Sequence, residues 1–139
     1  MSELNTSNWL TLPLSISAGL LAVVTVFVAA GMFVDRQERK GIAQALTSGD
    51  ASRALPLLRK FGCSGCHTIP GVPGADGQVG GPLSGLSARV YIGGVLTSSS
   101  DHLVEWIVTP QRFSPNTAMP VTGITESEAR DVAAYLYQR

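Results

Sequence analysis

The chain has two cysteines in 139 residues, and both lie in the segment Cys63-Ser64-Gly65-Cys66-His67. Because no other thiol is present, the chain can build neither a disulfide framework nor a zinc site of four cysteines. A C-x-x-C pair followed at once by histidine is typical of covalent haem attachment, in which both thiols bond to the porphyrin and the imidazole binds iron. Such a cofactor would supply much of the core of a short chain, so this motif limits the fold more than any other feature.

Two other uses of a C-x-x-C pair fit the surrounding sequence less well. A thioredoxin-like redox dithiol stands near a βαβ unit, whereas the flanks here are rich in glycine and proline and contain no convincing strand. A zinc site needs about four ligands, and the only cysteine or histidine outside the motif is His102. The motif therefore favours haem.

A long apolar stretch lies near the N-terminus. No ionisable side chain occurs between Glu3 and Asp35, and residues 9–34 consist mostly of Leu, Ile, Val, Ala and Phe. As a helix, this stretch is long enough to cross a hydrocarbon core of about 30 Å, and Trp9 stands where an interfacial aromatic residue belongs. We predict a tail over residues 1–8 and a single transmembrane anchor over residues 9–34.

A cleaved signal peptide is the alternative for the same stretch, with Val28-Ala29-Ala30 as its cleavage site. However, no Lys or Arg precedes the apolar residues, and the apolar run is longer than a signal peptide requires. These features favour a retained anchor.

The rest of the chain predicts a mostly α fold of short helices and irregular loops. We expect a stalk or linker over residues 35–49 and a domain over residues 50–139. Asp50 is a suitable N-cap for a helix that carries apolar residues towards the cysteine motif. Pro56 lacks an N–H, so this helix either begins near Leu55 or is kinked.

Later segments carry clearer helix signals. The nine glycines and prolines between residues 70 and 85 predict a loop without regular structure. Ser99 or Ser100 can cap a helix that ends before Pro110. Thr125 and Glu128 have the spacing of a capping box that opens the last helix. The apolar face of that helix consists of Ala129, Val132, Ala133, Leu136 and Tyr137.

Met119 is the candidate for the second axial position on the iron. It is the only methionine outside the N-terminus and the apolar stretch, and it lies in a polar, extended segment over residues 115–120. A thioether opposite histidine favours reduced iron and raises its potential. The alternatives are that Met119 fills a gap in the core, or that His102 binds the iron; we expect His102 at the surface.

From Gly49 to the C-terminus the chain resembles a class I monohaem cytochrome c, and it is especially similar to the cytochrome c domains that accompany respiratory terminal oxidases. The resemblance rests on the order and spacing of the segments FGCSGCH (61–67), GGPLSGL (80–86), LVEWI (103–107), TAMP (117–120) and VAAYL (132–136). It implies one haem c attached to Cys63 and Cys66, with His67 and Met119 as the axial ligands of its iron.

The resemblance also implies roles around the haem. Pro82 would offer its carbonyl oxygen to the Nδ1–H of His67, which orients the ring and makes it a better donor to iron. Arg89, Tyr91 and Trp106 are candidates for contacting the haem propionates or for walling the pocket. The alternatives are that Arg89 is a surface cation and that Tyr91 and Trp106 are ordinary core aromatics.

The first and last helices of such a domain are expected to cross closely. Family members usually have glycine near Ala54 and an aromatic or aliphatic residue near Leu58. Ala54 departs from that pattern, and together with Pro56 it puts the close crossing in question.

Electron transfer is the function that the resemblance implies. An iron with both axial positions filled has no open position for a small-molecule substrate, and it changes oxidation state by one electron. We therefore expect an electron carrier rather than an enzyme, serving a terminal oxidase or a quinol-oxidising complex of the respiratory chain. Two alternatives stay open: a haem enzyme or gas-binding protein with an open iron site, and an accessory structural subunit.

Charge bears on the partners and on the location. Ten basic and ten acidic residues give no indication of nucleic-acid binding. With Lys40 and Lys60 as the only lysines, long-range steering should be weak, which favours a fixed subunit over a tethered shuttle.

Because c-type haem is attached outside the cytoplasm, we place the domain on the periplasmic side of the inner membrane as part of a single-pass protein. Arg36, Arg39 and Lys40 follow the apolar stretch, so the positive-inside tendency points the other way. In assigning the side of the membrane, we give the haem motif more weight than this charge pattern.

Overall fold

A helix of 37 residues, α1 (Thr11–Thr47), leads into the rest of the chain. The computed structural model describes the backbone of residues 11–139 and the side chains of residues 17–139. The predicted tail over residues 1–8 and the predicted interfacial Trp9 lie outside the described residues. The chain divides into two units between Gln37 and Glu38, and each unit is described by itself.

The first unit consists of the apolar part of α1. Its large apolar side chains are exposed all round the helix, and Phe27 reaches 74% exposure. Among the described residues, one helix is long and apolar enough to cross a membrane by length and composition, a test that a signal sequence also passes. The predicted N-terminal apolar helix is confirmed.

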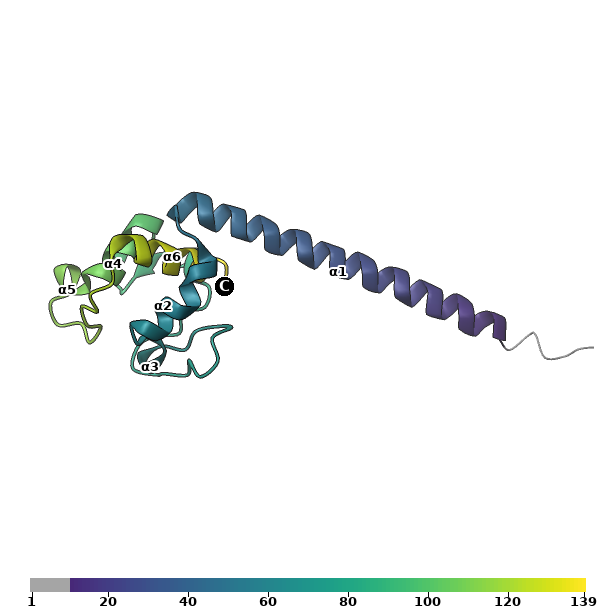
Figure 1. Cartoon of the computed structure of the whole chain (residues 1–139), viewed down its shortest axis with the longest axis horizontal. Helices are drawn as coiled ribbons and strands as arrows, with labels where there is room; N and C mark the ends of the chain where they lie inside the picture. Colours follow the sequence, from purple (N-terminus) through teal and green to yellow (C-terminus); the bar gives the residue numbers. More distant parts are fainter. Residues whose placement is uncertain (1–10) are drawn as a thin grey trace, which may run out of the picture. The chain divides into compact units, whose positions relative to one another are not determined.

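The second unit is built from short elements (Figure 1). After the end of α1 they are η1 (Ala51–Arg53), α2 (Ala54–Lys60), α3 (Cys63–Cys66), η2 (Leu86–Ala88), β1 (Tyr91–Ile92), β2 (Leu96–Thr97), α4 (Ser100–Val108), α5 (Pro110–Phe113) and α6 (Glu126–Tyr137). The predicted mostly α class is confirmed. Strands β1 and β2 form an antiparallel pair, with Tyr91 opposite Thr97. Strands of two residues are too short to show an alternating pattern in the sequence, so this hairpin was not predicted.

The N-cap predicted at Ser99 is confirmed, whereas Asp50 caps a 3₁₀ turn before α2 and not α2 itself. The Asp50 side chain accepts a hydrogen bond from the Ser52 N–H, and it caps the 3₁₀ turn η1 that leads into α2. Helix α2 then begins at Ala54, which places Pro56 in the first turn, where its missing N–H costs no helical hydrogen bond. Ser99 caps α4 by accepting from the His102 N–H.

The end of α4 differs from the sequence prediction. The helix ends at Val108 as expected, but Pro110 occupies the first turn of a further helix, α5, instead of marking only a stop. Proline suits this position because its φ is already helical and its absent N–H would have had no partner.

Helix α6 is fixed at its start and along one face. Both hydrogen bonds of the predicted capping box between Thr125 and Glu128 are present. On the predicted apolar face, Tyr137 is half-buried, and the residues that are at most 2% exposed are Ala129, Val132, Ala133 and Leu136.

The close crossing of α2 and α6, left in question by the sequence, is present. Ala54 and Leu58 on α2 are fully buried, and they belong to the same core as Ala133 and Leu136 on α6. Alanine is small enough to let the two helices approach each other. Lys60 Nζ adds a hydrogen bond of 2.9 Å to Glu128 Oε1 across the same pair of helices.

The segment that precedes α2 packs directly on α6. Thr47 is fully buried, and a Cβ added at Gly49 would lie 2.0 Å from the carbonyl oxygen of Arg130. The Asp50 N–H donates to Asp131 Oδ1 at 2.7 Å, and Arg130 Nη1 donates to the Thr47 carbonyl at 3.2 Å. The chain that enters the domain is therefore part of its packing.

Substitution of Gly49 by alanine should destabilise the domain. The added methyl group overlaps backbone atoms of α6, which cannot move aside as a side chain can, and overpacking of this kind costs about 1–3 kcal/mol. Thermal unfolding of the full-length protein in detergent measures the loss. Gly41→Ala is the matched control because a Cβ there meets nothing within 4 Å. Equal melting temperatures for the two variants would contradict the close approach.

Glu128 should make the stability of the domain depend on pH. The hydrogen bond from Lys60, followed by those from Thr125, lowers the pKa of Glu128 from 4.5 to about 2. A carboxylate whose pKa is lower in the folded state stabilises the fold above pH 4.5, and this contribution is lost as the pH falls towards 2.

The variant Glu128→Gln should therefore melt at a lower temperature than the wild type at neutral pH, and the gap should narrow on acidification. Melting temperatures measured across this pH range check the prediction, with Glu105→Gln, an exposed carboxylate on α4, as the control. A gap that stays constant with pH would show that Glu128 does not contribute through its charge.

Candidate haem site

The cysteine motif forms a helical turn of its own. Gly62 separates α2 from the motif and adopts a left-handed conformation with φ of 70°. Helix α3 then spans Cys63–Cys66. Residues three apart in a helix lie on the same face, so the two thiols are neighbours. His67 then leaves the helix with extended backbone. Both cysteines are half-buried, and neither forms a disulfide in the part of the chain that the structure describes.

The environment of Cys63 suits a thiol that stays protonated. Burial against the core raises the pKa of the Cys63 thiol above its usual value. A thioredoxin-like dithiol needs the opposite shift, because its nucleophile is the thiolate. The raised pKa of Cys63 therefore gives no support to a redox dithiol.

The imidazole of His67 is oriented by a backbone carbonyl. Its Nδ1 lies 2.7 Å from the carbonyl oxygen of Gly81. A carbonyl oxygen only accepts hydrogen bonds, so Nδ1 carries a proton, and in the neutral imidazole Nε2 then keeps its lone pair. This is the arrangement of a metal-binding histidine whose other ring nitrogen is held by a hydrogen bond.

The prediction that Pro82 supplies this carbonyl is wrong by one residue. The oxygen belongs to Gly81, while the Pro82 carbonyl accepts a hydrogen bond from Arg89 Nη2. The same guanidinium nitrogen donates to the Ser84 carbonyl at 3.1 Å. Arg89 thus holds the loop around Pro82 in place, which leaves the preceding carbonyl for the histidine.

Glycines let the loop lie directly against the motif. A Cβ added at Gly80 would lie 2.2 Å from Cε1 of His67, and one added at Gly77 would lie 2.6 Å from the backbone of Cys66. The Gly80 N–H also donates to the Cys66 carbonyl at 2.8 Å. The predicted irregular loop over residues 70–85 is confirmed, and its composition follows from this close contact.

Met119 lies between α5 and α6, and both of its backbone polar groups are bonded. Its N–H donates to Thr117 Oγ1 at 3.3 Å, and its carbonyl accepts from Gln111 Nε2 at 2.7 Å. The residue is half-buried. Ligation of one iron by His67 and Met119 stays a prediction. Sequence reasoning missed Gln111, because nothing in the pattern PQRF links it to a residue eight positions later.

The two aromatic candidates, Trp106 and Tyr91, differ in how far they are buried. Trp106 is half-buried, and a Cβ added at Gly93 in the β1–β2 turn would lie 2.5 Å from its ring. Tyr91 is 58% exposed whereas its neighbour Ile92 is buried, as alternation along β1 requires. Contacts of Arg89, Tyr91 and Trp106 with a haem stay predictions.

His102 is half-buried instead of lying at the surface as expected. Its Nδ1 lies 2.7 Å from the Thr97 carbonyl, which ties α4 to β2. Among the described side chains, no three Cys, His, Asp or Glu residues come together as a possible metal site.

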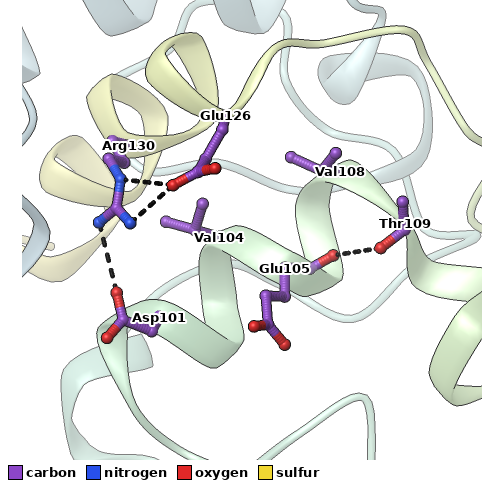
Figure 2. A pocket seen from close by; sticks show the side chains of 7 residues that line it. All are labelled: Asp101, Val104, Glu105, Val108, Thr109, Glu126 and Arg130. Carbon is purple, nitrogen blue, oxygen red and sulfur yellow. Dashed lines mark hydrogen bonds and ion pairs between the residues drawn. The ribbon is translucent and has the colours of Figure 1, made fainter.

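A separate groove of about 280 Å³ lies between α4 and α6 (Figure 2). Figure 2 shows Arg130 between the two acidic side chains that it binds, with Nη2 at 2.8 Å from Glu126 and Nη1 at 3.3 Å from Asp101. The hydrogen bond with Glu126 is the main reason that the pKa of Arg130 is raised. None of the predicted haem residues lines this groove.

The residues around the motif fit a covalent porphyrin. They provide two adjacent free thiols, an imidazole with its Nε2 lone pair available, and a backbone cradle in which only glycine fits. Phe61, Leu83 and Trp106 are half-buried at the edge of the same core and offer apolar surface. These properties define a domain that carries one covalently bound haem.

Comparison with known proteins agrees with this class. The family description "Cytochrome c" matches residues 57–139, which is more than half of the chain. The chain belongs to the cytochrome c family. Such a domain implies electron transfer, and Cys63 and Cys66 are consistent with covalent haem c. No curated protein and no solved structure matches the chain.

Replacement of either cysteine should reduce covalent haem attachment, because each substitution removes one of the two bonds between protein and porphyrin. Haem staining of the full-length Cys63→Ala and Cys66→Ala variants on denaturing gels measures the effect. Ser64→Ala is the matched control: it lies between the cysteines, and its buried hydroxyl has no partner among the described residues. A full haem complement in either cysteine variant would overturn the assignment of the thiols.

Proposed function

We propose that the protein is a membrane-anchored electron carrier of the respiratory chain, in which His67 and Met119 are the axial ligands of a haem c held by Cys63 and Cys66. The main support is the cysteine motif within a cytochrome c domain. The partner is a terminal oxidase or a quinol-oxidising complex. The protein carries electrons and is not itself an enzyme.

The bound haem supplies a one-electron redox couple. His67 contributes the Nε2 lone pair, and the bond from its Nδ1–H to Gly81 keeps the ring orientation fixed when charge on the site changes. The cradle formed by Gly77 and Gly80 limits movement of the ring and of the motif. A site that moves little between its oxidised and reduced states suits repeated single-electron transfer.

Met119 has two roles in this proposal. Its thioether would bind the iron together with His67 and so exclude small molecules, and a thioether ligand would favour the reduced state of the site. One of its backbone hydrogen bonds comes from Gln111 on α5 and the other from Thr117 in the segment between α5 and α6, so the loop that carries the side chain is restrained.

The anchor is the apolar part of α1, which we propose crosses the inner membrane once, with the cytochrome domain on the periplasmic side. Its length and composition support a membrane span. The side rests on the attachment of c-type haem outside the cytoplasm. This location gives the domain direct access to the respiratory complexes of the same membrane.

The entry into the domain supports a fixed subunit over a shuttle. Thr47 and Asp50 are hydrogen-bonded to α6 and Gly49 lies against its backbone, so the last part of the tether belongs to the folded domain. The scarcity of lysines provides little long-range attraction for a diffusing partner. A permanent complex needs neither a long flexible tether nor steering. The proteins that co-purify with the detergent-solubilised chain identify that complex.

Met119→Ala should leave the haem attached but lower its reduction potential, because attachment depends on the cysteines while the potential follows the axial ligand. The reduced wild type should not bind carbon monoxide, whereas the variant should bind it at the vacated position. A redox titration and absorption spectra with carbon monoxide measure both effects on the full-length protein.

Carbon monoxide binding to the untreated reduced wild type would contradict the proposal in favour of gas or peroxide chemistry. An unchanged potential in the variant would show that Met119 is not a ligand. Retained haem in both proteins is the internal control, since it shows that any difference arises at the iron.

A further inference from the structure

A long side chain on α5 reaches the loop that carries Met119. Gln111 Nε2 lies 2.7 Å from the Met119 carbonyl oxygen, and the contact is partly buried. A carbonyl oxygen cannot donate, so the amide must present its NH₂ group to Met119 and its oxygen elsewhere. The orientation of the Gln111 amide is therefore determined.

That orientation leaves Oε1 of Gln111 buried and without a partner among the described residues. An unpaired buried acceptor disfavours folding, and a leucine of similar size would avoid this cost. The chain retains glutamine all the same. The hydrogen bond from Nε2 to Met119 is the one contact that glutamine makes here and leucine would not.

Helix α5, which carries Gln111, and the loop that leads from it to Met119 are themselves held in place. Pro110, in the first turn of α5, is fully buried, and its carbonyl accepts from the Ser114 N–H at 3.0 Å. The Thr117 N–H donates to the Ser114 carbonyl at 3.0 Å, and Thr117 Oγ1 accepts from the Met119 N–H. Met119 is thus connected to α5 by two routes, one through the loop and one through Gln111.

We propose that Gln111 is a positioning residue that keeps the Met119 thioether on the iron. The inference rests on the proposed ligation by Met119. A thioether is a neutral, weak donor, so a stronger donor displaces it whenever the loop moves away. The hydrogen bond from Gln111 stabilises the loop in one position, and its loss should make displacement easier without changing haem attachment.

Imidazole is the probe, because it competes for the position that Met119 occupies. In oxidised full-length Gln111→Leu, imidazole should bind roughly 2- to 12-fold more tightly than in the wild type, the range expected for loss of one hydrogen bond. The weak long-wavelength absorption band that a thioether–iron bond gives oxidised haem should be lost at correspondingly lower imidazole concentration.

Gln111→Leu also separates positioning from a merely structural role. Leucine keeps the volume and removes the unpaired Oε1 together with the hydrogen bond to Met119. These two effects on stability oppose each other, so the melting temperature should change little while imidazole binds more tightly. Arg112→Ala, the next residue on α5, is the matched control and should leave imidazole affinity unchanged. An unchanged imidazole affinity in Gln111→Leu, or an equal change in both variants, would overturn the proposal.

Failure of the proposed function has a different signature. If Met119 is not a ligand, the wild type lacks the thioether–iron band, and Met119→Ala binds imidazole no more tightly than the wild type. If Met119 is a ligand and Gln111 does not position it, the band is present, Met119→Ala binds imidazole more tightly, and Gln111→Leu behaves as the wild type.

Discussion

The crossing of α2 over α6 is the contact on which the rest of the domain depends. Ala54 and Leu58 are fully buried there, and α3 with the two cysteines begins just after α2 ends. The segment before α2 packs on the same helix through Gly49. A chain of short helices buries little apolar surface by itself, so this one crossing fixes both the position of the cysteine motif and the path by which the chain enters the domain.

The two proposed iron ligands are held in different ways. His67 is held by backbone: the Gly81 carbonyl oxygen bonds its ring, and Gly80 lies so close to the ring that no side chain fits there. Met119 is held by side chains, Gln111 and Thr117, through its own backbone. The histidine side of the site is therefore fixed by the course of the chain. The methionine side depends on individual hydrogen bonds, and it is the side on which single substitutions can tune the strength of ligation.

Sequence alone predicted those features that depend on near neighbours. The caps at Asp50 and Ser99 and the capping box at Thr125 are local hydrogen bonds, and they appear where the residue types predict them. The choice of Gly81 over Pro82 depends on where Arg89 reaches, which no local pattern encodes. The role of Gln111 was missed for the same reason. The hairpin was missed because strands of two residues show no alternating pattern, and α5 was missed because Pro110 was interpreted only as a stop.

The burial of Ala43, Thr47 and Gly49 in the second unit decides where the domain can be separated from the apolar part of α1. Ala43, Thr47 and Gly49 are buried within the second unit, which begins at Glu38. A soluble fragment cut at Asp50 would remove these residues and leave their contact surface on α6 open to water. A fragment that begins at Glu38 keeps the surface covered while omitting the apolar part of α1. The last two to three turns of α1 thus serve as the first structural element of the cytochrome domain.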